Sequence, residues 1–175
     1  MKLNIFKIPI FIDNIDVDKL KLNEVLFEET WESKTPSTFK NGNNLLNKES
    51  TNYLLGIIAG LLFPEIKKEF SINLDKIWIN KYKEKDYQEE HIHTKSHFSF
   101  IIYSKVKESN TVFLSRDREI IDAFGMDDMA LFQTKFEASC RSNQIIVFPS
   151  FLTHRVKKAE EDYETISGNI SLNLS

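Results

Sequence analysis

The stretch Ile77–Lys105, IWINKYKEKDYQEEHIHTKSHFSFIIYSK, contains the pattern from which the fold of the whole chain is predicted. Inside it, His91 and His93 are separated by a single residue. Side chains alternate between the two faces of an extended chain, and each residue advances it by about 3.3 Å. Both histidines therefore lie on one face, with their backbones about 6–7 Å apart, so that both imidazoles can reach one ion. A run of strand formers, FSFIIYSK, follows them.

A third histidine stands at a comparable place far downstream. His154 follows IIVFPS, an apolar strand pattern that ends in a tight turn. Two histidines at one strand end and a third from a distant strand are typical of a metal held at the mouth of a β-barrel. Imidazole suits iron, zinc, copper and nickel, and an open site with three protein ligands is the signature of non-haem iron oxygenases. We therefore predict a metal site built from His91, His93 and His154.

Two neighbouring residues bear on this ligand set. Glu89 is in phase with His91, so it stays open as a carboxylate ligand in place of His93. His97 lies beyond a short polar segment, and we expect it to be structural or to support the ligands.

The composition predicts a single soluble domain over residues 1–175. The net charge of −3 provides no basic surface, so nucleic acid is not expected as a partner. The longest apolar run, Tyr53–Phe63, is too short to span a membrane. The single Cys140 suits a reducing compartment, so we expect a cytoplasmic protein. Abundant Lys, Asn and Ile residues indicate an AT-rich coding sequence, as in phage-like genomes. The sequence leaves the oligomeric state open, with a homodimer as one option.

Residues 1–75 are expected to form an N-terminal strand and supporting helices. Ile5–Ile12 is predicted as the first strand, at an edge because of Pro9. Val17–Trp31 is predicted as a helix and Ser33–Lys48 as a loop. The clearest helix is Thr51–Phe63, preceded by the capable N-caps Ser50 and Thr51. One face of it carries the spacing i, i+3, i+4, i+7, i+8 in Leu54, Ile57, Ile58, Leu61 and Leu62.

Residues 76–175 are expected to form the barrel core that carries the metal motifs. Strand patterns recur at Ile77–Tyr82, Ser99–Lys105, Thr111–Leu114, Leu131–Phe136, Gln144–Phe148 and Thr165–Leu174. Arg116–Gly125 is predicted as a loop with a helical turn. The fold class that follows is mainly β with helices: a double-stranded β-helix, or jelly-roll (cupin-like) barrel, with N-terminal helices packed on one face.

This set of motifs resembles the 2-oxoglutarate/Fe(II) oxygenases of the small bacterial and bacteriophage type. Their pattern runs from a Trp-x-Asn strand through a His-x-His pair and a Ser-containing strand ending in Tyr to Phe-Pro-Ser, His and a final strand. The matching residues here are Trp78, Asn80, His91, His93, Ser96, Ser99, Tyr103, Phe148, Pro149, Ser150 and His154. The resemblance implies a double-stranded β-helix, iron, 2-oxoglutarate and dioxygen. It predicts a dioxygenase, more narrowly a hydroxylase, whose substrate is an unidentified small molecule or protein.

The last strand departs from the family pattern. There the family normally carries an Arg, followed two residues later by Ser or Thr, which grip the far carboxylate of 2-oxoglutarate, whereas this chain has Thr165 and Ser167. A buried dicarboxylate needs a cation or several donors to offset its desolvation. We predict Lys105 as the replacement cation, because it is in phase with Tyr103 on one strand. Tyr103, Thr165 and Ser167 are expected to assist it, and Asn80 to line the same pocket.

Other assignments stay open. Arg118 resembles an Arg that the family carries after its central strand, and it is the next candidate if Lys105 does not hold the carboxylate. Three histidines on a β-barrel also resemble the thiol dioxygenases, which bind substrate directly to iron without 2-oxoglutarate, and the missing Arg favours this alternative. The third alternative is a non-catalytic jelly-roll binding or structural protein with a degenerate site.

Overall fold

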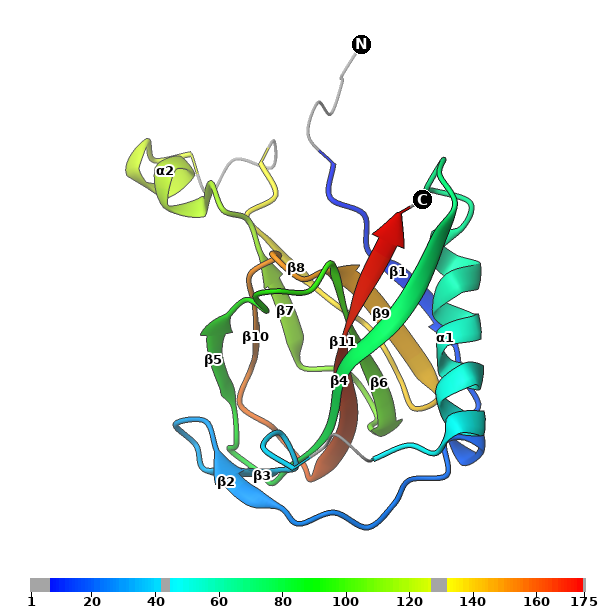
Figure 1. Cartoon of the computed structure of the whole chain (residues 1–175). Helices are drawn as coiled ribbons and strands as arrows, with labels where there is room; N and C mark the ends of the chain where they lie inside the picture. The colour runs from blue at the N-terminus through cyan, green and yellow to red at the C-terminus, as the bar shows by residue number, and fades with distance from the viewer. Residues whose placement is uncertain (1–6, 42–44, 127–131, 175) are drawn as a thin grey trace.

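The computed structural model describes residues 7–41, 45–126 and 132–174. Within these residues the strands form two antiparallel sheets that face each other (Figure 1). The larger sheet has the order β1-β9-β6-β11-β4-β3-β2, and the smaller sheet has the order β5-β10-β7-β8. The strands are β1 Phe11–Asn14, β2 Glu28–Thr30, β3 Thr35–Ser37, β4 Phe70–Tyr82, β5 Gln88–His91, β6 Phe98–Lys105, β7 Thr111–Leu114, β8 Lys135–Glu137, β9 Gln144–Pro149, β10 His154–Val156 and β11 Tyr163–Leu174. This arrangement confirms the predicted double-stranded β-helix.

Strand β6 illustrates how the two layers of the core arise. Phe100 and Ile102 belong to the hydrophobic cluster that includes helix α1, whereas Ile101 and Tyr103 pack with Phe113 between the two sheets. The alternation of side chains along one strand therefore supplies both the helix interface and the barrel interior.

Helix α1, Lys48–Leu62, covers the outer face of the larger sheet (Figure 1). Its prediction is confirmed, with all five predicted apolar residues in the core cluster or packed against it. The predicted N-caps are wrong, because the N-cap is Asn47, whose side chain accepts from the Ser50 backbone N–H. Ser50 is instead buried in the first turn, where its hydroxyl donates to the Lys19 carbonyl oxygen (3.1 Å).

The predicted helix Val17–Trp31 is wrong. Only the 3-10 turn η1, Val17–Lys19, is helical in this segment, and β2 begins at Glu28. The few apolar residues do not form a continuous helical stripe, so long-range contacts decide the conformation. Leu22 forms an isolated bridge with Leu46, and Leu26 is 79% exposed.

The predicted loop Ser33–Lys48 is wrong in part, because β3 lies within it and pairs with both β2 and β4. Thr35 and Ser37 of β3 are fully buried, which a periodicity of apolar residues does not reveal. Residues 42–44 of this segment lie outside the described residues.

The predicted strand Ile77–Tyr82 begins earlier, because β4 starts at Phe70, and the strands β5 and β10 were not predicted. The other boundaries shift modestly. Strand β1 starts at Phe11 and lies at a sheet edge as predicted, with residues 1–6 outside the described range. Strand β8 occupies the end of the predicted strand Leu131–Phe136, whose first residue is not described. The helical turn predicted after β7 is helix α2, Arg118–Ala123. No helix in the described part of the chain has the length and apolar character needed to cross a membrane.

Candidate metal centre

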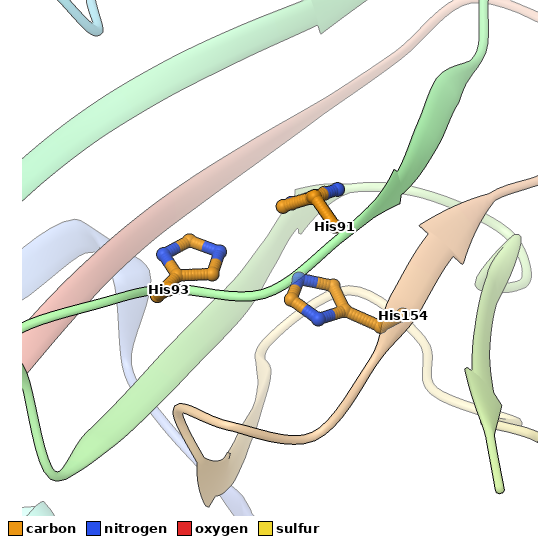
Figure 2. A group of neighbouring side chains, drawn as sticks. All are labelled: His91, His93 and His154. Atoms are coloured by element: carbon orange, nitrogen blue, oxygen red, sulfur yellow. The ribbon is translucent and has the colours of Figure 1, made fainter. Parts of the chain in front are cut away.

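The three predicted histidines meet at one end of the barrel (Figure 2). His91 is the last residue of β5 and is paired in register with His154, the first residue of β10. His93 lies just beyond β5, where its backbone N–H donates to the Ser150 carbonyl oxygen (2.9 Å). One ligand nitrogen from each ring lies within 4.8 Å of the other two. The sequence motif and the strand pairing thus bring three imidazoles to one point.

Backbone carbonyls orient two of the rings. His91 Nδ1 lies 2.7 Å from the Glu89 carbonyl oxygen, and His154 Nδ1 lies 3.0 Å from the Leu152 carbonyl oxygen. A ring nitrogen that donates to a carbonyl leaves the opposite nitrogen, Nε2, as an acceptor for a metal. Both hydrogen bonds are to residues two positions upstream, so the local backbone selects the tautomer.

The His93 ring is oriented by a side-chain network from other strands. Asn169 of β11 hydrogen-bonds the His93 ring. Its Oδ1 also accepts from the Ser99 hydroxyl (2.9 Å), which lies 2.8 Å from the Ser150 hydroxyl. Ser99 and Ser150 are both buried and belong to the motifs found in the sequence. Asn169 was missed, because nothing local marks a strand residue as the partner of a distant histidine.

All three imidazoles are held in the neutral form. Burial lowers the pKa of His91, and it lowers the pKa of His93 to about 4 with a further contribution from the His91 charge. Burial and the charges of the other two histidines hold the pKa of His154 well below its usual range. Neutral imidazole is the form that binds metals, so the site is prepared for a cation at neutral pH.

The histidines border a small cavity inside the barrel. It has room for about one water molecule, with a volume of about 10 Å³ for the centre of a water-sized group. Its walls are formed by Trp31, Trp78, Asn80, Gln88, His91, His93, Phe100, Ile101, Phe148, His154 and Ser167. Trp31 and Gln88 were not predicted from the sequence. The indole nitrogens of both tryptophans and Oδ1 of Asn80 are buried and have no hydrogen-bond partner. The three imidazoles fit a metal ion, and the cavity beside them has room for a ligand of about the size of one water molecule.

The two glutamates before His91 are engaged elsewhere. The Glu89 carboxylate accepts from the Glu32 backbone N–H, so it is tied to the β2–β3 turn. The Glu90 carboxylate lies 2.5 Å from Arg118 and 3.6 Å from Arg155. Among the described residues, the cluster able to hold an ion consists of the histidines alone, which favours His93 over Glu89 as the third ligand.

The fourth histidine has a structural role, as expected. His97 Nδ1 accepts from the Leu172 backbone N–H (3.1 Å), and its own backbone N–H donates to the Ile170 carbonyl oxygen (2.9 Å). His97 thus joins the start of β6 to β11.

The predicted cosubstrate residues divide into two groups. Asn80 and Ser167 line the cavity. Tyr103 and Thr165 do not: the Tyr103 hydroxyl donates to Thr111 (2.9 Å), and Thr165 hydrogen-bonds the buried Tyr82. Both side chains are therefore already occupied inside the barrel.

Lys105 is exposed and does not line the cavity. It pairs with Glu164, whereas Tyr103 pairs with Thr165, so Ser104 is an extra residue in β6. Such a bulge bends the strand and redirects the side chains beyond it. The contact of Lys105 with a bound carboxylate stays a prediction that this structure does not favour. Arg118 is paired with Glu90 and does not line the cavity either.

Comparison with known proteins places these features in a family. The family model described as "Putative 2OG-Fe(II) oxygenase" matches residues 76–173, which include all three histidines. Among curated proteins, no sequence matches significantly.

Several solved structures share the fold. An oxidoreductase of the 2OG-Fe(II) oxygenase family from Burkholderia pseudomallei has 12% identity and a TM-score of 0.52, covering 93% of this chain and 67% of that one. A prolyl hydroxylase from Trichoplax adhaerens, in complex with a hypoxia inducible factor peptide fragment, has 11% identity and a TM-score of 0.55, covering 83% and 70%. HygX from Streptomyces hygroscopicus, with nickel and 2-oxoglutarate bound, has 10% identity and a TM-score of 0.50, covering 94% and 83%.

At 10–12% identity, the similarity to these solved structures establishes a common fold. The match to the family model establishes the relationship in sequence. It covers more than half of the chain and spans the strands that carry the histidines. The chain therefore belongs to the 2OG-Fe(II) oxygenase family.

Proposed function

We propose that this protein is an Fe(II)- and 2-oxoglutarate-dependent hydroxylase in which His91, His93 and His154 bind the iron. The observation that carries the proposal is the convergence of three neutral imidazoles inside a barrel of this family. Support comes from the hydrogen bonds that direct each ring, because metal-binding histidines nearly always have such partners.

Iron and 2-oxoglutarate, when bound, supply the oxidising power for inserting an oxygen atom of dioxygen into a substrate bond. The chain supplies geometry and shielding. Trp78 stacks on His93 with the ring centroids 5.5 Å apart, and Phe148 meets His154 edge-on at 4.8 Å. These rings exclude bulk water, and electrostatic attraction is stronger in a dry site. Because all three ligands are neutral, they leave the full charge of the ion to attract an anionic ligand.

The primary substrate, a small molecule or a protein, would approach the barrel end where β5 stops and β10 starts. Cys140 is a free, buried thiol. It is consistent with a cytoplasmic location, where reducing conditions also keep iron ferrous. The cytoplasmic location, a phage-like origin and a homodimer stay proposals.

The ligand set is tested by anaerobic Fe(II) binding to the native protein and to His91→Ala, His93→Ala and His154→Ala. We expect each variant to lose most of its iron affinity, because two imidazoles hold an exchangeable ion weakly. His97→Ala is the matched control, since it removes the histidine that lies outside the cluster, and it should keep native affinity. Full iron content in His93→Ala together with loss in Glu89→Ala would replace this ligand set by one with a carboxylate.

One observation favours a second candidate, a three-histidine dioxygenase that works without 2-oxoglutarate. No Lys or Arg is among the described residues that line the cavity. Anaerobic titration of the Fe(II) protein with 2-oxoglutarate separates the two functions. A metal-to-ligand charge-transfer band and succinate formation in air support the first. Iron binding without the band supports the second, and no iron binding indicates a degenerate site.

A further inference from the structure

The chain between β7 and β8 leaves the barrel and returns to it at one point of the smaller sheet. The Ser115 N–H donates to the Thr134 carbonyl oxygen (2.8 Å), which closes the base of this excursion. Helix α2 lies within it and stands outside the barrel strands (Figure 1). Residues 116–126, the described part that contains α2, are called the arm below.

Two contacts hold the base of the arm against segments that carry metal ligands. Arg118 is paired with Glu90, the residue before His91 (2.5 Å). Arg116 donates to the carbonyl oxygen of Phe151, in the turn before β10 (3.4 Å), and lies 5.1 Å from the centroid of its ring. The arm is therefore fixed to the rim of the metal centre.

The arm exposes large apolar side chains. Ile120 is 60% exposed and Phe124 is 76% exposed, and within the described part of the chain neither belongs to a hydrophobic core cluster or packs against one. Residues four apart lie on one face of a helix, so these two side chains form one apolar patch. Ile92 and Phe151, at the rim, are also about half exposed. Contiguous exposed apolar surface of this kind marks interaction sites.

Carboxylates accompany the apolar patch. Asp117, the N-cap of α2, precedes Ile120 by three residues and Phe124 by seven, so it lies on the same helix face. Its side chain makes no capping hydrogen bond. Among the described residues Asp117 and Asp122 form no ion pair, whereas both arginines of the arm contact the rim. The unpaired charges that the arm presents are therefore negative.

The clefts of the described residues favour a protein substrate over a small molecule. The cavity beside the histidines holds about one water molecule. Two larger clefts, of about 590 and 470 Å³, are lined by other parts of the chain and by none of the three histidines. A substrate bound on the arm must also reach the metal, and an extended polypeptide spans such a distance at about 3.3 Å per residue.

We propose that the arm binds a segment of a protein substrate in which a Lys or Arg accompanies a large apolar residue. The basic side chain pairs with Asp117, and the apolar side chain covers Ile120 and Phe124. From Asp117 to Phe124 the helix advances about 10 Å, which an extended segment covers in about three residues, so the two recognised residues are about three positions apart. The inference rests on the proposed function, because it assigns the class of substrate to that metal centre.

The test uses a library of short synthetic peptides, with Lys, Gln or Glu fixed at one position and Leu or Ser about three positions away. The probes are bound without oxygen to the Co(II)-loaded full-length protein, and affinities are measured by fluorescence polarisation. We expect peptides with Lys and Leu to bind about two- to fivefold more tightly than those with Gln and Leu. Peptides with Lys and Ser should bind roughly tenfold more weakly than those with Lys and Leu.

Each part of the preference has its own variant. Asp117→Asn should remove the preference for Lys over Gln and keep that for Leu over Ser. Phe124→Ser should weaken the binding of the Leu peptides roughly tenfold. Phe63→Ser and Glu65→Gln are the matched controls, because they change an exposed Phe and an exposed Glu at the end of α1, and both should leave peptide binding unchanged. Co(II) affinity, measured in every variant, verifies that the metal centre is assembled.

The possible failures are distinguishable. A native protein without preference among the peptides, or a native preference in both Asp117→Asn and Phe124→Ser, would refute binding by the arm and leave the proposed function intact. Self-association of the native protein that Phe124→Ser abolishes, measured by sedimentation, would assign the patch to a second copy and also overturn the inference. Absence of the charge-transfer band with Fe(II) and 2-oxoglutarate would remove the proposed function, and with it the assignment of any bound peptide as a substrate.

Discussion

Replacing Asn169 by Ala tests whether a side chain from β11 positions His93 for the metal. Asn169 hydrogen-bonds the His93 ring and accepts from the Ser99 hydroxyl at 2.9 Å. The substitution removes both contacts. Ser99 keeps its 2.8 Å hydrogen bond to Ser150, so the variant leaves few buried groups without a partner.

The expected effect is larger on metal binding than on folding. Loss of a residue that supports a metal-binding histidine typically costs about 10–100-fold in metal affinity, which corresponds to about 1.4–2.7 kcal/mol. One or two net hydrogen bonds contribute about 0.5–1.5 kcal/mol each to the free energy of unfolding. Asn169 is only partly buried, so we expect the low end for the apoprotein, about 1 kcal/mol or less.

Intrinsic fluorescence supplies the assay, because both tryptophans lie within 5.5 Å of a histidine ring. Co(II) should quench this emission on binding, and the titration yields the affinity. Ser171→Ala is the control, since it removes a hydroxyl from the same strand that donates to Asp75 at the surface (2.6 Å). If Asn169→Ala binds Co(II) within about twofold of the native protein while unfolding more easily, Asn169 has a structural role only and the reasoning is wrong.

Three further predictions concern stability and the site. Ile58→Ala in α1 should cost about 2–5 kcal/mol in urea unfolding because the side chain is fully buried, whereas Leu26→Ala, 79% exposed, should change stability by less than about 0.5 kcal/mol. Equal effects would mean that α1 does not pack on the sheet. Gly168→Ala should lower the thermal midpoint, because an added Cβ would lie 2.6 Å from the Lys76 carbonyl oxygen. Gly60→Ala, with open space in an exposed helix position, should raise it through about 0.5–1 kcal/mol of helix propensity. Finally, a chelator should reverse the Co(II) quenching of both tryptophans, and persistent quenching would point to aggregation instead.

Local periodicity was sufficient to predict the main helix and most of the long core strands, although β2 and β3 were missed. Helix α1 and the strands β6, β7, β9 and β11 were located to within about three residues, because alternation and helical spacing are properties of a short segment. The same locality explains the metal site. The spacing of His91 and His93 fixes their common face, and a strand end places His154, so the ligand set needed few assumptions about distant packing.

The parts that were not predicted all depend on contacts between distant segments. Trp31 was assigned to a helix, yet it reaches the cavity because the β2–β3 turn docks beside β5. Lys105 was expected inside, yet one extra residue in β6 leaves it exposed.

The chain by itself thus determined which three histidines form the cluster able to hold a metal ion, and the tertiary structure decided what surrounds them. His91 and His93 are two residues apart, and on an extended backbone side chains with this spacing lie on the same face. The partner of His93, Asn169, and the wall formed by Trp31 depend on which strands pair and where a turn docks. Those choices are made by the burial of apolar surface across the whole domain, and no short segment encodes them alone.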